Sequence, residues 1–116
     1  MAAKPAIPPR PKKTLRIPPM IELFGFRIRT VYNPTLLADR ERYGEYCSRQ
    51  MTITIDSNLS EQRKALTYCH ELAEAVCDIQ HLNLEESDKQ AFGLAIHALI
   101  MQENILFAVI TETEGD

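Results

Sequence analysis

The sequence predicts an α+β fold in which a small antiparallel sheet is followed by two packed helices. Three observations predict it. Residues 20–56 alternate β-branched and aromatic side chains with polar ones and are interrupted by turn residues, which is typical of strands. Residues 60–104 instead repeat apolar side chains at the spacing of helices. The chain of 116 residues is long enough for one compact domain and too short for two.

The N-terminal segment, residues 1–19, differs in composition from the rest of the chain. It holds five basic residues, no acidic residue and six of the seven prolines, whereas the remainder has eight basic and all sixteen acidic residues. We interpret it as a flexible basic arm that its prolines bias towards extended polyproline II, with a weak electrostatic affinity for nucleic acid. The single domain then spans residues 20–110, and residues 111–116 are expected to form an acidic, frayed tail.

The first half of the domain is expected to contain the sheet. Residues 20–32 predict a strand pair that turns at Gly25, and Asn33 with Pro34 ends this pair. A short helix followed by a loop around Gly44 comes next, and residues 50–56 return to strand alternation. We therefore expect a small sheet with antiparallel strands.

The second half predicts two helices. The first is expected over residues 60–80, where apolar positions recur at helical spacing after Asn58 or Ser60, either of which can cap the helix. The stretch HLNL interrupts the pattern, and the second helix is expected over residues 85–104. That segment starts with acidic residues, which interact favourably with the positive end of the helix dipole.

The first of these helices contains the sequence HELAE. On a helix, His70 and Glu74 lie one turn apart with about 5 to 6 Å between their Cβ atoms, so that both side chains can reach one ion. Glu71 then points about 100° away, as does the general base of the metallopeptidase signature H-E-x-x-H. An ordinary hydrogen-bonded His/Glu pair on a helix surface has the same spacing, so the pattern alone leaves both interpretations open.

The order of several short segments resembles small, often phage-encoded, metallopeptidase-like proteins of the ImmA/IrrE and SprT-like group. These segments are Gly-Glu at 44–45, a strand ending in Ile-Asp at 55–56, Leu-Ser at 59–60, and HELAE at 70–74 as an HExxE variant of HExxH. The resemblance covers roughly residues 20–104. It implies a minimal zincin-like fold whose first long helix carries the HELAE sequence.

The resemblance also implies a zinc site. His70 and Glu74 are the expected ligands, and Glu71 is the expected catalytic base that activates water. Relatives often take a third ligand from the following helix. On one face of that helix, Glu86 is the first candidate for this ligand and His97 the alternative.

Peptide hydrolysis also needs a group that donates a hydrogen bond to the negatively charged oxygen that forms from the peptide carbonyl. No spacing rule selects this oxyanion donor from the sequence. Tyr46, Arg49 and Tyr68 carry suitable groups.

The function that the resemblance implies is zinc-dependent hydrolysis of a peptide bond in a protein partner. Two other classes stay open: a catalytically inactive, peptidase-like adaptor module, and a DNA-associated factor that uses the basic arm of residues 1–19. No apolar run reaches the roughly 20 residues of a membrane span, and no signal-peptide pattern is present. We therefore expect a cytoplasmic protein whose three cysteines are reduced.

Overall fold

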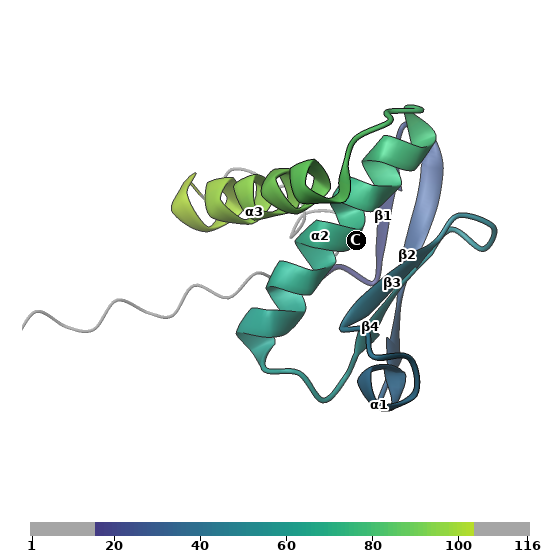
Figure 1. The fold of residues 1–116 in the computed structure, drawn as a ribbon, viewed down its shortest axis with the longest axis vertical. Helices are drawn as coiled ribbons and strands as arrows, with labels where there is room; N and C mark the ends of the chain where they lie inside the picture. The colour runs from purple at the N-terminus through teal and green to yellow at the C-terminus, as the bar shows by residue number, and fades with distance from the viewer. Residues whose placement is uncertain (1–15, 104–116) are drawn as a thin grey trace, which may run out of the picture.

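The structure, a computed structural model, describes residues 16–103. The acidic tail of residues 111–116 and most of the predicted basic arm lie outside this range. In chain order the elements are β1 (Met20–Leu23), β2 (Phe26–Asn33), α1 (Leu36–Arg40), β3 (Gly44–Cys47), β4 (Thr52–Asp56), α2 (Glu61–Ile79) and α3 (Glu86–Glu103) (Figure 1). The predicted α+β class and the two long helices at the end of the domain are confirmed.

The sheet has the strand order β1-β2-β4-β3 and is mixed rather than antiparallel. The pairs β1–β2 and β3–β4 are antiparallel as expected, but β2 and β4 run parallel. The expectation was wrong for this central pair because it treated β2 and β4 as consecutive strands. Residues 34–51 contain α1 and β3, and so they supply the crossover of about a dozen or more residues that a parallel pair requires.

Strand β3 replaces the loop that was expected around Gly44. It forms the edge of the sheet beside β4 and packs against α2. Gly44 permits this close packing, because a Cβ atom at that position would overlap Cγ2 of Thr67 and lie 3.2 Å from Cγ of Glu71. The strand was missed because its four residues, GEYC, show no apolar alternation.

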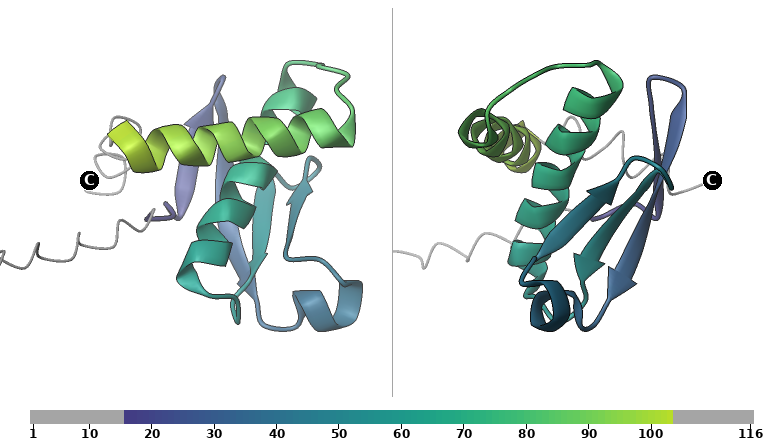
Figure 2. Two further views of the ribbon diagram at one scale, coloured as in Figure 1. Left: turned by 60° about the vertical axis from the view of Figure 1, so that its left-hand side comes forward. Right: turned by 45° about the vertical axis from the view of Figure 1, so that its right-hand side comes forward.

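One face of the sheet is covered by α2, and α3 packs across α2 (Figure 2). The core joins sheet residues to the buried side of the helices; its buried members are Ile28, Ile53, Ile55, Ala65, Tyr68, Cys69, Leu72, Ala75 and Ile100. Within the described residues, no helix is long and apolar enough to cross a bilayer.

The last residues of the predicted arm pack against the sheet. Pro18 is fully buried, and Ile17 packs on the core. The backbone oxygens of Pro18 and Pro19 accept hydrogen bonds from the side chain and backbone of Thr30, at 2.8 and 2.9 Å. Residues 17–19 therefore pack with the domain, although the sequence analysis assigned them to the arm.

The ends of α2 follow local capping rules. Ser60 is the N-cap, and its side chain accepts a hydrogen bond from the backbone N–H of Arg63 at 3.2 Å. At the other end His81 adopts a left-handed conformation with φ of 56°, and the N–H of Leu82 donates to the carbonyl of Cys77. This turn directs the chain back towards α3.

Gly93 sets the distance between the two long helices. A Cβ atom there would lie 2.8 Å from Cα and 3.2 Å from the backbone nitrogen of His70. The absence of a side chain thus lets α3 approach the backbone of α2 beside HELAE.

Candidate metal centre

A cleft of about 840 Å³ opens between α2, α3 and the edge strand β3. One face of α2 forms its floor, because positions 63, 67, 70 and 74 recur at helical spacing. The lining residues are Arg63, Leu66, Thr67, His70, Glu71 and Glu74 of α2, Glu86, Gln90 and Leu94 of α3, and residues 41–44 with Tyr46.

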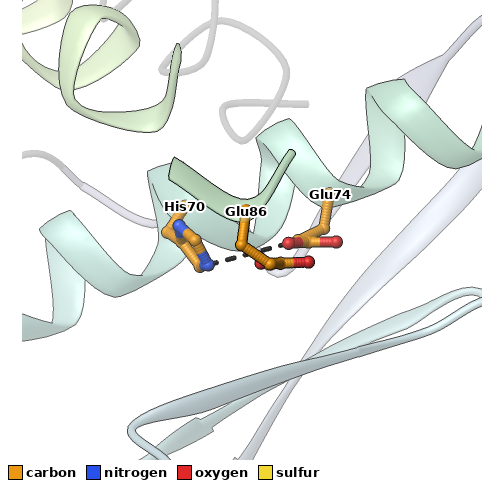
Figure 3. Close-up of side chains that lie close together, drawn as sticks. All are labelled: His70, Glu74 and Glu86. Carbon is orange, nitrogen blue, oxygen red and sulfur yellow. Dashed lines mark ion pairs between the residues drawn. The ribbon is translucent and has the colours of Figure 1, made fainter. Parts of the chain in front are cut away.

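Three potential metal ligands converge in this cleft (Figure 3). His70 and Glu74 come from consecutive turns of α2, and Glu86 comes from the first turn of α3. Their ligand atoms all lie within 4.8 Å of one another, and the His70 Nε2 to Glu74 Oε1 distance is 3.8 Å. The side chains of His70 and Glu74 are 32% and 22% exposed, whereas that of Glu86 is 76% exposed. Two half-buried groups and one accessible carboxylate thus form a single cluster.

Glu71 lies beside this cluster but is not one of its members. Its side chain is only 9% exposed, and its Oε2 atom is 4.0 Å from His70 Nε2. Burial, followed by repulsion from the Glu74 carboxylate, raises the pKa of Glu71 to about 7. A hydrogen bond from the backbone of Tyr46 and the charge of Arg42 act in the opposite direction. The carboxyl group of Glu71 is thus buried at the border of the cluster, close to His70 and Glu74.

A lysine ammonium group also contacts the cluster. Lys89 Nζ lies 3.3 Å from Glu74 Oε2 and 3.3 Å from Glu86 Oε1. Hydrogen bonding to and attraction by these carboxylates raise the pKa of Lys89, and Lys89 in turn lowers the pKa of Glu86. The two carboxylates thus form a site that attracts a cation.

The donor set fits a divalent metal ion. One imidazole and two carboxylates are ligands that zinc accepts, at about 2.0 to 2.2 Å from the ion, so two ligands of one ion lie at most about 4.4 Å apart. The separations within the cluster, up to 4.8 Å, are close to this limit. The Glu86 side chain is largely exposed and so has room to change its rotamer.

The two candidates for the third ligand lie in different surroundings. Among the described residues the cluster contains Glu86 and not His97, and His97 does not line the cleft. His97 is half-buried elsewhere on α3, where burial lowers its pKa. Gly93 contacts the backbone of His70, and Glu86 and His97 lie on opposite sides of this contact along α3, about two turns before it and one turn after it. The metal assignments themselves stay predictions.

The three candidates for an oxyanion donor are also separated. Tyr68 is fully buried in the core, and Arg49 lies in the exposed turn between β3 and β4. Tyr46 lines the cleft, but its hydroxyl group donates to Asp78 Oδ2 at 2.9 Å. Of the three, only Tyr46 borders the cluster, and its hydroxyl group is already engaged.

Sequence reasoning missed the basic residues at the site, one of which contacts the cluster and two of which line the cleft. Lys89 was not singled out, although its position three residues after Glu86 places the two on the same side of a helix. Arg42 and Arg63 were also overlooked; they line the cleft, where Arg63 stacks over the ring of Tyr43 at 5.2 Å from its centroid. The cleft therefore contains basic as well as acidic groups.

Comparison with known protein families gives one match. The family model for Peptidase M78, described as the IrrE N-terminal-like domain, matches residues 25–111. This range includes the cleft and every residue of the cluster. Searches of curated proteins and of solved structures gave no match.

Proposed function

This chain belongs to the Peptidase M78 family of IrrE N-terminal-like domains, and from this membership we propose that it is a zinc-dependent peptidase acting on a protein or peptide partner. The observation that carries the proposal is the convergence of His70, Glu74 and Glu86 beside the buried carboxyl group of Glu71. Each of these groups faces the same cleft. The family alone supports the coarser description, a metallopeptidase-like protein.

The three cluster residues would hold the metal. His70 and Glu74 are fixed by the α2 backbone, whereas Glu86 is contributed by α3 and joins the two helices through the site. When bound, zinc supplies Lewis acidity for water and for a peptide carbonyl, moderated here by two anionic ligands. This donor set carries more negative charge than the two imidazoles and one carboxylate of a His2Glu site.

Glu71 is the residue that moves the proton. Its carboxyl group borders the cluster, is shielded from bulk water, and is oriented by a hydrogen bond from the backbone of Tyr46. In the proposed reaction a carboxylate oxygen of Glu71 accepts a proton from the attacking water and passes it to the leaving amine nitrogen. Water thereby adds across the C–N bond, which gives a carboxylic acid and an amine.

The edge strand supports an extended peptide as substrate. Strand β3 has a neighbour on one side only, and its residues Gly44 and Tyr46 line the cleft. A peptide can pair with the backbone groups of such an edge, apart from the Tyr46 N–H that donates to Glu71. Because the cleft is open and about 840 Å³ in volume, an exposed segment of a partner protein has room to enter it.

The first test is the metal content of the purified protein, measured by elemental mass spectrometry after incubation with zinc and removal of excess. We expect near-stoichiometric zinc in the natural sequence and loss of most of it in His70→Ala, Glu74→Gln and Glu86→Gln. His97→Ala is the matched control, because it removes the other candidate for the third ligand, and it should retain zinc. Equal loss in the His97 variant, or no zinc in the natural sequence, would contradict the proposal.

A second candidate function is a metal-free adaptor that uses the peptidase-like cleft for binding. The ion pairs of Lys89 with Glu74 and Glu86 favour it, because they compensate both carboxylates without a metal. A folded natural protein that takes up no zinc would support this candidate.

The predicted DNA association rests on the basic arm, most of which lies outside the described residues. Salt-dependent DNA binding that is lost on deleting residues 1–19 would test it.

A further inference from the structure

We propose that Lys89 occupies the cation position of the cluster in the metal-free protein, and that its ammonium group must leave Glu74 and Glu86 before a divalent ion can bind them. This inference rests on the proposed function, since it concerns the same cluster. It adds a built-in competitor to the site. Metal binding is then an exchange of one cation for another.

The contacts of Lys89 support a central position. Its Nζ atom is equally close, at 3.3 Å, to a carboxylate oxygen of Glu74 and to one of Glu86. Its side chain is only 19% exposed, although it lies in the largely exposed first turns of α3. A surface lysine that served solubility alone would extend into solvent, whereas this one is directed inward between two acids.

Simultaneous binding of both cations is unfavourable. An ammonium group and a divalent ion that share two carboxylates would lie a few ångströms apart, where like charges repel and both compete for the same oxygen lone pairs. The alternative is that Lys89 supports the metal, by holding Glu74 Oε2 while Oε1, which faces His70, acts as the ligand. The two models predict opposite effects of removing the ammonium group.

The structure also contains a place to which the ammonium group can move. A smaller cavity of about 250 Å³ adjoins the cluster and is lined by Glu74, Asp78 and Lys89 among others. Asp78 follows Glu74 by one turn of α2, so its carboxylate lies on the same side of the helix. Lys89 can therefore exchange two acidic partners for a third, while Tyr46 already donates its hydroxyl hydrogen to Asp78.

The test is a zinc titration against a chromophoric chelator at pH 7, with the natural sequence, Lys89→Met, Lys89→Arg and Lys64→Met. Lys64 is the matched control, because it is similarly buried, with 17% exposure, and pairs with Glu61 away from the cluster. We expect Lys89→Met to bind zinc more tightly, because no ammonium group then competes for the two carboxylates. The gain should be about fivefold to tenfold, since partly exposed ion pairs are individually weak. Lys89→Arg, which keeps the charge, and Lys64→Met should retain the natural affinity.

A second measurement follows the lysine directly. The side-chain NMR signal of Lys89, assigned by its absence in Lys89→Arg, should shift when zinc is added, whereas the signal of Lys64 should not. Asp78→Asn should lower zinc affinity severalfold, because it removes the destination of the ammonium group. An unchanged Lys89 signal in zinc-loaded protein would overturn the displacement.

The outcomes separate this inference from the proposed function. If the natural protein binds zinc and Lys89→Met binds it equally well or more weakly, the inference fails and the metal site stands. If only Lys89→Met binds zinc, the inference stands and the natural chain fits the adaptor function. If neither protein binds zinc, both proposals fail.

Discussion

Glu71 and Glu74 are three residues apart in one helix, yet their side chains have different surroundings. Glu71 is buried beneath β3, whereas Glu74 faces His70 and Lys89. The HELAE spacing alone predicted that the two side chains point in different directions, because a helix fixes which positions share a face. Their expected roles came from the family resemblance. Spacing could not choose between Glu86 and His97, since both lie on one face of the next helix. That choice depends on where the helices cross.

The role of Glu71 predicts a variant that keeps the metal and loses the reaction. Glu71→Gln should retain zinc, because residue 71 is outside the ligand cluster. It should lower the hydrolysis of denatured casein by about 10²-fold to 10⁴-fold, the range for removal of a general base. Glu61→Gln is the control, because Glu61 is 75% exposed and pairs with Lys64 away from the cluster. Full activity of Glu71→Gln would assign the proton transfer to another group.

At the scale of elements, the position of Glu86, the candidate third ligand, depends on Gly93. Gly93→Ala would press a methyl group against the backbone of His70, so α3 must shift and Glu86 must move with it. We expect destabilisation by about 1 to 3 kcal/mol, as for other overpacked contacts, together with weaker zinc binding. Chemical denaturation and zinc titration measure the two effects separately.

The control for Gly93→Ala is Ala98→Gly, at an exposed position of the same helix. It should destabilise the protein by about 1 kcal/mol through helix propensity alone and leave zinc affinity unchanged. Loss of zinc affinity in both variants would mean that general stability, rather than the helix crossing, governs the site.

Gly44 has the corresponding role between β3 and α2. Gly44→Ala should destabilise the fold by about 1 to 3 kcal/mol, because the new methyl group overlaps Cγ2 of Thr67. Thr67→Ser removes that methyl group, so the double variant should recover part of the loss, and a double-mutant cycle should give a coupling of about 0.5 kcal/mol or more. Strictly additive effects would show that the two positions do not compete for space.

The elements differ in how far the sequence predicted them. The β1–β2 pair and both long helices were predicted, because their hydrophobic pattern extends over the whole element. Strand β3 has only four residues, and its position depends on pairing with β4 and on the contact of Gly44 with α2. Such long-range packing is absent from a local pattern, and without β3 the parallel arrangement of β2 and β4 could not be foreseen.

At the scale of the whole molecule, the metal should act as a link between helices. The candidate ligands of α2 and α3 lie on either side of a short connection, so a metal bound by both helices would stabilise the folded state only. Zinc at about 100 times its dissociation constant should contribute about 2.7 kcal/mol, which raises Tm by about 10 °C or more in a small domain. A thermal melt with and without chelator measures this shift.

His70→Ala is the control for that melt. It should show little change in Tm on addition of zinc. An equal shift in this variant would locate the stabilising ion elsewhere on the protein.

The first turn of α3 combines a candidate ligand with high exposure. Glu86, Ser87 and Asp88 are all exposed, and burial on this helix begins only with the later residues. Helix ends of this kind unwind far more often than a whole domain unfolds. Zinc release should therefore follow fraying of this turn, so the dissociation rate in excess chelator should exceed the global unfolding rate by orders of magnitude. The site would then lose and regain its ion while the core stays intact.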